Sequence, residues 1–140
     1  MKTVSEIMVT NVLSAKSTDS VHKARMILKE MNIRHLPVVD DETGDFVGLV
    51  SQRSLLNYAF KTVEQYGMSY LEKKERQTAV SDVMVKDCQT TAPDIDLIIA
   101  GEFFTSKKSH CLPVVDGGRL VGIITSVDFV KLALKLLARD

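Results

Sequence analysis

The sequence has no tryptophan, only three prolines and two cysteines, and no excess of charge, since 18 Lys and Arg balance 18 Asp and Glu in 140 residues. A net charge of zero argues against a nucleic-acid partner, which would require clustered basic residues. No apolar run approaches the roughly 18 residues that a membrane helix needs. The N-terminal residues also lack the apolar core of a signal peptide. These absences predict a cytoplasmic globular protein with no membrane partner.

The two cysteines are expected to be reduced thiols in that compartment, with Cys88 packed in the interior. They form no Cys-x-x-Cys motif, and the three scattered histidines add no metal-ligand spacing, so no metal site is predicted. Cys111 follows His110, which invites comparison with a nucleophile and its base. Adjacent residues of a strand point to opposite faces, and no third group orients the pair. The chain is therefore not expected to be an enzyme or to require a cofactor.

The sequence does contain an internal repeat. Three segments of the first half return in the second: VSEIMV at 4–9 as VSDVMV at 80–85, LPVVD at 36–40 as LPVVD at 112–116, and FVGLVS at 46–51 as LVGIIT at 120–125. The first two pairs have the same offset. The offset of the third pair is two residues smaller, because the five-residue turn at 41–45 corresponds to the three-residue turn at 117–119. Loops tolerate such length changes, so the pattern indicates duplication followed by divergence.

Each copy predicts the same series of elements. A short extended piece comes first, near 11–14 and 87–91, and an amphipathic helix follows, from Ser17–Ser20 in copy one and from Pro93-Asp94 in copy two. Two strands then flank a turn, at 36–39 with 46–50 and at 112–115 with 120–124. A second helix begins near Ser51 and near Thr125. The predicted fold class is α+β (α/β), built from two β-α-β-β-α repeats.

The repeats divide the chain into three parts. Residues 1–60 form the first repeat and 80–140 the second, with a helix extension and linker at 61–79. The linker carries the charged run Glu72-Lys73-Lys74-Glu75-Arg76. Such a run is typical of a solvated helical face.

The order Met, helix, Leu-Pro-Val-Val-Asp, turn, Val-Gly between apolar residues, and Thr-x-x-Asp resembles the CBS domain, named after cystathionine β-synthase. Neither motif is specific alone, but their joint spacing appears twice and covers nearly the whole chain. The chain is therefore identified as a tandem CBS-domain pair (Bateman module), a stand-alone CBS-domain protein. The resemblance implies pseudo-twofold packing of the repeats. It also implies two clefts that hold adenosine-containing ligands such as AMP, ADP, ATP, NAD or S-adenosylmethionine.

Thr125 and Asp128 form the sharpest candidate for a ligand site. A helix is expected to begin there, so the Asp128 carboxylate would lie in the positive potential of a helix N-terminus. It could accept hydrogen bonds from both ribose hydroxyls. The resemblance implies this role for the Asp and a supporting role for the Thr hydroxyl. The same spacing fits a helix capping box that needs no ligand, and the two roles can coexist.

Copy one departs from this pattern, because Ser54 stands where copy two has Asp128. A serine hydroxyl cannot supply two charged acceptor positions, so the sequence predicts one competent ribose site and one weaker cleft. By the resemblance, the weaker cleft would be lined by Met8, Val9, Thr10, Ser51, Ser54 and His110.

The resemblance also implies phosphate and adenine contacts in the Asp128 cleft. Phosphates would be met by Arg34, whose planar fork suits phosphate oxygens, and by His35, whose charge grows as pH falls toward about 6.5. Alternatively, both are only a polar edge before a buried strand. The implied adenine contacts are Met84, Val85, Lys86, Asp87, His110, Cys111, Pro113 and Ile123.

The final helix, expected from Ser126 to Arg139, has more apolar surface than one core requires. Its polar residues form a single stripe at helical spacing, and apolar residues fill the rest. We therefore expect a homodimer through the second helix of each repeat, as the resemblance also implies.

Two functions remain open at this stage. The first is a regulatory module that binds an adenine nucleotide, such as AMP, ATP or NAD, and signals to a separate, unidentified effector protein. The second is a scaffold for dimerisation and interaction that needs no ligand. Asp128 with Arg34 favours the first hypothesis, and the degraded copy-one site favours the second.

Overall fold

The computed structural model describes residues 2–107 and 109–139, and the chain divides into two compact units. The central unit is Leu13–Cys88, and the terminal unit combines Met1–Val12 with Gln89–Asp140. The mixed helix and strand content confirms the predicted fold class. The units do not coincide with the repeats. The first residues of each copy, its early segment (up to Val12 in copy one and 80–88 in copy two), belong to the unit built from the other copy.

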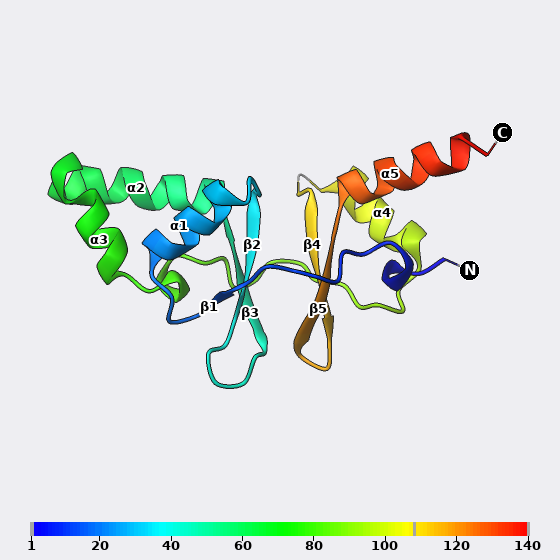
Figure 1. Ribbon diagram of the computed structural model, residues 1–140, viewed down its shortest axis with the longest axis horizontal. Coiled ribbons are helices and arrows are strands. Elements are labelled where there is room, and N and C mark those ends of the chain that lie inside the picture. The colour runs from blue at the N-terminus through cyan, green and yellow to red at the C-terminus, as the bar shows by residue number, and fades with distance from the viewer. Residues whose placement is uncertain (1, 108, 140) are drawn as a thin grey trace. The chain divides into compact units, whose positions relative to one another are not determined.

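The central unit contains a three-stranded sheet of order β1-β2-β3 and three α-helices. Its elements are β1 (Ala15–Lys16), α1 (Val21–Glu30), β2 (His35–Val39), β3 (Phe46–Ser51), α2 (Gln52–Tyr66), η2 (Met68–Tyr70), α3 (Leu71–Gln77) and η3 (Val80–Asp82). β1 runs parallel to β2, and β2 runs antiparallel to β3. Figure 1 shows the three helices on one side of the β2–β3 hairpin, with α2 starting at the end opposite the hairpin turn.

The core of the central unit follows the predicted apolar pattern. Ser20 caps α1 by accepting a hydrogen bond from the Lys23 backbone N–H at 3.0 Å, which sets the start of the helix. The buried positions of α1 then recur at helical spacing and face the sheet. The buried cluster consists of Ala15, Val21, Ala24, Leu28, Leu36, Val38, Val50, Leu55 and Val80.

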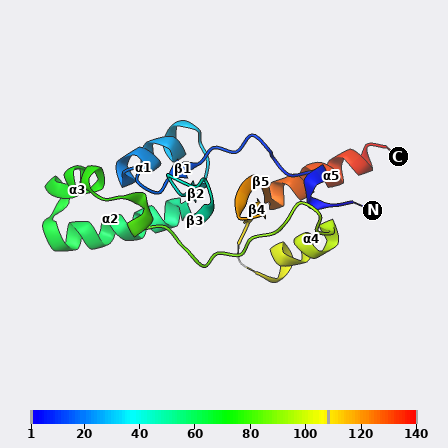
Figure 2. The ribbon, with the colours of Figure 1, turned by 90° about the horizontal axis from the view of Figure 1, so that it is seen from below.

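The terminal unit is built in the same way around one hairpin. Its elements are η1 (Val4–Glu6), α4 (Leu97–Ser106), β4 (Cys111–Asp116), β5 (Arg119–Thr125) and α5 (Ser126–Leu137). β4 and β5 are antiparallel, and Gly117 and Gly118 in their turn have φ values of 60° and 84°, which favour glycine. Figures 1 and 2 both show the N-terminal segment beside α4. The buried cluster consists of Val4, Leu97, Ala100, Leu112, Val114 and Ile124.

The first helix of copy two begins later than the sequence predicted. Pro93-Asp94 was expected to start it, but α4 begins at Leu97. The reason is that Asp96 is the N-cap and accepts a hydrogen bond from the Ile98 backbone N–H at 2.8 Å. The second helices begin as expected, after Ser51 and after Thr125.

The segment 61–79 is more ordered than a solvated linker. α2 extends to Tyr66, and α3 then packs on α1 and α2. Glu75 lies within the charged run 72–76, which was predicted to be solvated. It is nevertheless only 3% exposed, because its carboxylate pairs with Arg25 of α1. The solvated interpretation is therefore wrong for Glu75 and holds for Glu72, Lys73 and Arg76, which are exposed.

Candidate functional site

In each unit, an early segment pairs with the second strand of the hairpin. In the terminal unit, Val9 and Ile123 exchange backbone hydrogen bonds, both 2.9 Å from nitrogen to oxygen. In the central unit, Val85 and Leu49 do the same at 2.9 Å. A glycine of each Val-Gly motif permits this close approach. A Cβ at Gly122 would lie 2.7 Å from the Met8 Sδ, far inside ordinary contact distance.

The predicted adenine contacts are divided between the two units. Met84 and Val85 lie against Gly48 and Leu49 in the central unit, whereas Ile123 belongs to the terminal unit. Lys86 and Asp87, both exposed, belong to the same central segment. Ile123 instead has Met8 and Val9 beside it, two residues that the sequence had assigned to the weaker cleft. The repeat alone could not reveal the exchange, since both early segments have nearly the same sequence.

Asp128 lies in the first turn of α5, directly after β5. Its Oδ2 accepts hydrogen bonds from the Thr125 backbone N–H at 2.8 Å and from the Thr125 hydroxyl at 3.3 Å. Asp128 is 9% exposed and is one of few buried polar side chains in the described residues. The capping interpretation of Thr-x-x-Asp is thus confirmed. It uses one of the two carboxylate oxygens.

The other oxygen of Asp128, Oδ1, is available. It receives no hydrogen bond from the described residues. No fully buried side-chain nitrogen or oxygen in that part of the chain lacks a partner, so Oδ1 is accessible to solvent. A carboxylate at a helix N-terminus lies in favourable positive potential, and hydrogen bonds to a carboxylate oxygen are strong. Capping therefore leaves Asp128 able to bind the hydroxyls of a ligand.

Ser54, the counterpart of Asp128, has no such spare acceptor atom. Its single Oγ accepts from the Ser51 backbone N–H at 2.9 Å and donates to the Ser51 carbonyl at 2.9 Å. The Ser51 hydroxyl lies at 3.4 Å from the same atom. The first turn of α2 contains no acidic residue. The two copies therefore share the cap and differ in the charged acceptor, as their sequences indicate.

The residues before the first strand of each hairpin lie beside the helix start of the same unit. In the terminal unit, the Ser126 N–H donates to the His110 carbonyl at 3.2 Å, and the His110 side chain is exposed. In the central unit, the Gln52 N–H donates to the Arg34 carbonyl at 3.1 Å, and His35 pairs with Ser51 in the sheet. Arg34 and His35 thus lie with Ser51 and Ser54 within one unit. A phosphate contact from them to a ligand at Asp128 stays a prediction.

Cys111 is 2% exposed and Pro113 is buried, so neither presents a side chain to a ligand. Burial raises the pKa of the half-buried Cys88 thiol, and the neighbouring Asp87 carboxylate adds to this shift. No group of three or more His, Cys, Asp or Glu side chains among residues 2–107 and 109–139 could hold a metal ion. No helix in this part of the chain is long and apolar enough to cross a membrane.

The comparisons with known proteins agree with the repeat and with this geometry. The CBS domain family matches twice, over residues 4–61 and 80–135. These two matches cover most of the sequence and correspond to the two copies. The chain belongs to the CBS domain family, as a tandem pair.

Solved structures of CBS pairs resemble the chain over nearly its whole length. CBSX2 from Arabidopsis thaliana, whose structure in complex with AMP is known, is 31% identical, with a TM-score of 0.81 over 97% of this chain and 98% of that one. The CBS domain pair of MJ0100, solved with 5-methylthioadenosine and S-adenosyl-L-methionine, is 27% identical. Its TM-score is 0.74 over 96% of this chain and 98% of that one.

Curated relatives are longer than this chain. MJ1404 of Methanocaldococcus jannaschii is 34% identical over 131 residues, which span 91% of this chain and 31% of MJ1404. The inosine-5'-monophosphate dehydrogenase of Thermoplasma acidophilum is 31% identical over 125 residues, 89% of this chain and 22% of that enzyme. The similarity to such enzymes therefore concerns about a fifth of their length.

Proposed function

We propose that the chain is a regulatory module that binds an adenosine-containing nucleotide at Asp128 in the terminal unit. The observation that carries this proposal is that the two oxygens of the Asp128 carboxylate have different contacts. Oδ2 caps α5 through Thr125, and Oδ1 is left accessible without a partner among the described residues. A vicinal diol such as ribose offers two hydroxyl donors to such a group. The AMP complex of CBSX2 and the adenosine-derived ligands of MJ0100 support the ligand class.

The surroundings of Asp128 fit the rest of an adenosine. Val9, which pairs with Ile123, is 45% exposed and offers an apolar surface for one face of a base. Thr10 and His110 are exposed in the same unit and provide polar groups. We therefore replace Met84 and Val85 by Met8, Val9 and Thr10 in the proposed adenine subsite, and keep His110 and Ile123. Arg34 and His35 remain the predicted phosphate ligands. The candidate nucleotides share adenosine and differ in their phosphate groups, so the phosphate contacts would select among them.

Nucleotide binding would act on a separate partner. A ligand shifts a conformational equilibrium only by its different affinity for the two states, so the proposed output is a change in the arrangement of the chain that another protein detects. No catalytic constellation accompanies the site in the described residues, and the proposed role is regulation without chemistry.

The test is calorimetric titration with AMP, ADP, ATP, NAD and S-adenosylmethionine. At least one of them should bind, with a dissociation constant below about 1 mM. The decisive variant is Asp128→Ser, because Ser54 shows that serine at this position keeps the cap. Loss of a charged acceptor of two hydroxyls should weaken binding about tenfold or more. The control Ser54→Ala perturbs the matching cap of the other copy and should leave the affinity nearly unchanged.

Two results would contradict the proposal. One is the absence of binding by all five ligands at millimolar concentration. The other is unchanged affinity in Asp128→Ser, which would reduce Asp128 to a helix cap.

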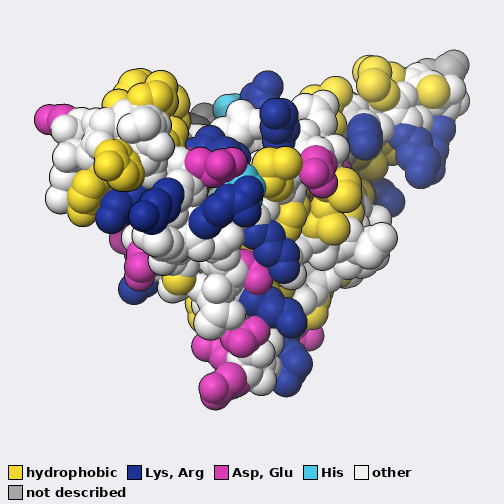
Figure 3. All heavy atoms as spheres, turned by 60° about the vertical axis from the view of Figure 1, so that its left-hand side comes forward, with side chains coloured by type: hydrophobic (Ala, Val, Ile, Leu, Met, Phe, Trp, Pro, Cys, Tyr) yellow, Lys and Arg dark blue, Asp and Glu magenta, His cyan; other side chains and the backbone are white. Residues whose placement is uncertain are grey.

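A second candidate function, a ligand-independent dimerisation scaffold, is favoured by one observation. The outward faces of the two second helices expose large apolar side chains. These are Leu56 and Phe60 on α2, and Val127, Val130, Leu134 and Leu137 on α5, each at least 53% exposed. Figure 3 shows hydrophobic side chains on one side of α5 and Lys and Arg on the other. Sedimentation velocity at micromolar concentration tests this function, and a monomer would exclude it.

A further inference from the structure

A pocket of about 420 Å³, the α2–α3 pocket, lies in the central unit where the end of α2 meets α3. Figures 1 and 2 both show α3 beside α2. Six side chains line the pocket: Gln65, Tyr66, Tyr70, Lys73, Lys74 and Gln77. Its volume is in the range of sites that hold small molecules, about 300–1,000 Å³. All six residues lie outside both matches of the CBS family, at 4–61 and 80–135, so the repeat does not supply this pocket.

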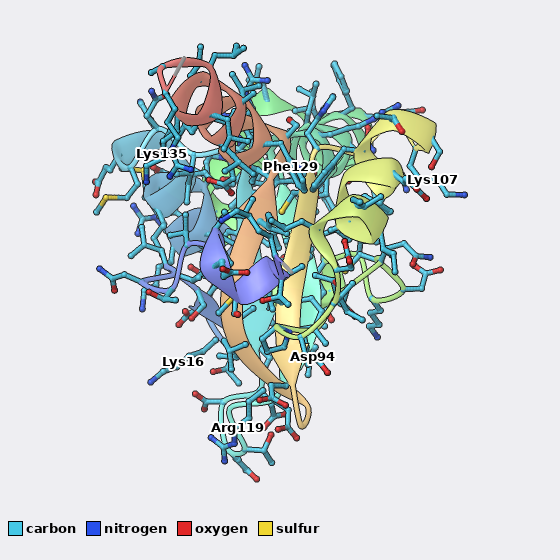
Figure 4. All side chains as sticks on the ribbon, turned by 90° about the vertical axis from the view of Figure 1, so that its right-hand side faces the viewer. Lys16, Asp94, Lys107, Arg119, Phe129 and Lys135 are labelled. Carbon is cyan, nitrogen blue, oxygen red and sulfur yellow. The ribbon has the colours of Figure 1, made fainter. Side chains whose placement is uncertain are left out.

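The lining of the α2–α3 pocket differs from the packing between the two helices of the terminal unit. There, Figure 4 shows Phe129 between α5 and α4, and its ring lies edge to face with that of Phe104, at 5.6 Å between the centroids. The α2–α3 pocket is lined instead by two phenols, two carboxamides and two ammonium groups. A ligand there would be recognised by charge and hydrogen bonds more than by apolar burial.

One face of α3 and the turn before it provides most of the lining. Four side chains recur three and four residues apart on this face: Tyr70, Lys73, Lys74 and Gln77. The two acidic residues of α3 are paired elsewhere. Glu72 pairs with Arg76, and Glu75 pairs with Arg25 of α1. No acidic side chain in the described part of the chain lines the pocket, so its two lysines lie together without a counter-charge.

Lys73 and Lys74 supply two positive charges to the pocket. Lys74 is half-buried, and its Nζ lies 4.0 Å from the centroid of the Tyr66 ring, a cation–π contact that positions the ammonium group. The backbone at Lys74 is also held, because the Thr78 hydroxyl donates to its carbonyl at 2.7 Å and lies 2.9 Å from the Tyr58 hydroxyl. Lys73 is exposed and forms no ion pair with the described residues. The pocket therefore combines one positioned and one unpaired ammonium group.

We propose that the α2–α3 pocket binds a small dianion that carries a phosphate monoester or two carboxylates. Two ammonium groups match two negative charges, and their hydrogen bonds to an oxyanion are about twice as strong as neutral ones. The phenols and carboxamides of the lining can donate to further oxygens. A ligand that bridges α2 and α3 would stabilise α3, from which the chain continues into η3 and the early segment of copy two.

The α2–α3 pocket is separate from the proposed nucleotide site and from the proposed homodimer face. Asp128 belongs to the terminal unit, whereas every residue of the pocket belongs to the central unit. At 100° per residue, Tyr66 lies on the side of α2 that carries the buried Leu55 and Thr62. Phe60 of the homodimer face points away from that side. The inference therefore depends on neither of those two proposals.

The test is an NMR titration of the full chain with phenyl phosphate, glycerol 3-phosphate and succinate. At least one of them should shift the amide resonances of residues 65–77 saturably, with a dissociation constant of about 1 mM or below. The first two probes carry a phosphate monoester and the third carries two carboxylates, so the probe that binds identifies the class. Phenol, glycerol and butyrate are the matched compounds of lower charge and should bind about tenfold more weakly or not at all. Bound ligand should also slow hydrogen exchange of the α3 amides.

Variants of the two lysines locate the site. Lys73→Gln and Lys74→Gln should each weaken binding of the probe about threefold or more, and the double variant should not bind it saturably. Lys73→Arg keeps the charge and should retain binding. The matched control is Lys61→Gln, because Lys61 is an exposed lysine of α2 that does not line the pocket. Asp128→Ser should leave the affinity for the probe unchanged, which distinguishes failure of this site from failure of the nucleotide site.

Two outcomes would overturn the inference. One is the absence of saturable shifts at residues 65–77 with each of the three probes at about 10 mM. The other is equal affinity of the double lysine variant and of Lys61→Gln, which would show that the probe binds without the lysines of the pocket.

Discussion

Arg25 and Glu75, fifty residues apart in the sequence, form a bidentate ion pair inside the central unit. Arg25 Nε lies 2.9 Å and 3.0 Å from the two Glu75 oxygens, and Nη2 lies 2.7 Å from Oε2. The Glu75 side chain is 4% exposed and that of Arg25 is 36% exposed. A planar guanidinium matches a carboxylate in this geometry, which fixes α3 against α1.

Arg25→Ala is expected to destabilise the chain by about 3 kcal/mol, because it leaves the buried Glu75 carboxylate without its partner. Chemical denaturation measures this change. The matched control is Arg76→Ala, whose ion pair with Glu72 spans 3.6 Å between side chains that are 59% and 72% exposed. An exposed pair at this helical spacing contributes only about 0.3–0.5 kcal/mol. Equal losses in the two variants would contradict the importance of the buried pair.

The role of Glu75 could not be predicted from the sequence. Four of its neighbours in the run 72–76 are charged, and a charged run is typical of a solvated helix. Burial depends on a long-range partner, and nothing near Arg25 in the sequence marks it as that partner. The hairpin strands and the starts of α1, α2 and α5 were predictable because they depend on local patterns, such as Ser20, Ser51 and Thr125 at the helix N-caps.

The site could be predicted in part for a similar reason. Thr125 and Asp128 are three residues apart, so their contact follows from helix geometry alone. The exchange of early segments between copies is a long-range property, and VSEIMV and VSDVMV are too alike to indicate which hairpin each one meets. The Gly of each Val-Gly motif was a usable signal for close backbone approach, but it does not identify the approaching chain.

Gly122→Ala should test that approach. The added Cβ would lie 2.7 Å from Met8 Sδ and 3.0 Å from the Val9 carbonyl oxygen, so the early segment must shift. We expect a loss of about 1–3 kcal/mol in the free energy of unfolding, as for overpacking. Met8→Ala in the same chain should recover part of the loss, since it removes the sulfur but not the carbonyl contact.

The sign of this change is diagnostic. Glycine to alanine at a position without crowding stabilises a protein by about 0.4–1 kcal/mol through the unfolded chain. A stabilised Gly122→Ala variant would therefore show that the early segment does not lie against β5. Gly48→Ala should behave alike in the central unit, where the Cβ would meet Met84 Sδ at 2.6 Å.

Phe60→Lys and Leu134→Lys test the homodimer from corresponding positions of the two copies. Phe60 of α2 is 66% exposed and Leu134 of α5 is 61% exposed, so neither change should unfold the chain. A lysine in an apolar interface would be desolvated without a partner, and we expect each variant to sediment as a monomer. Lys131→Ala, on the polar stripe of α5, serves as the control and should leave the assembly unchanged. Dimers in both lysine variants would move the interface elsewhere.

The two cysteines should differ in their reaction with iodoacetamide. Burial first, and the Asp87 charge in addition, raise the pKa of the Cys88 thiol, so its thiolate fraction at neutral pH is below that of an unperturbed cysteine. Cys88 should therefore react more slowly in the folded chain than after unfolding, and its rate should rise with pH. Cys111, 2% exposed, should react only after unfolding. Mass spectrometry of native and denatured samples measures both, and rapid native labelling of Cys111 would contradict its burial.

Ser54→Asp should give copy one the acceptor that it lacks. The Ser51 backbone N–H already donates to residue 54 at 2.9 Å, as that of Thr125 does to Asp128 at 2.8 Å, so an aspartate can cap α2 with one oxygen and keep the other available. The new charge also lies at a helix N-terminus with no acidic residue in its first turn. It should stabilise the chain by about 0.3–1 kcal/mol, a gain that screening by salt reduces.

The ligand readout of Ser54→Asp is the stoichiometry of the calorimetric titration. If a charged acceptor is what copy one lacks, the variant should bind additional nucleotide per chain, while Asp128→Ser combined with Ser54→Asp should bind only through the new position. Ser54→Asn offers a neutral acceptor of similar size and should not add a site. A variant that gains the predicted stability but binds no further nucleotide would show that the cap forms and that the difference between the copies lies in other residues. Arg34 and His110 occupy corresponding positions of the two copies, so they would be the first residues to swap.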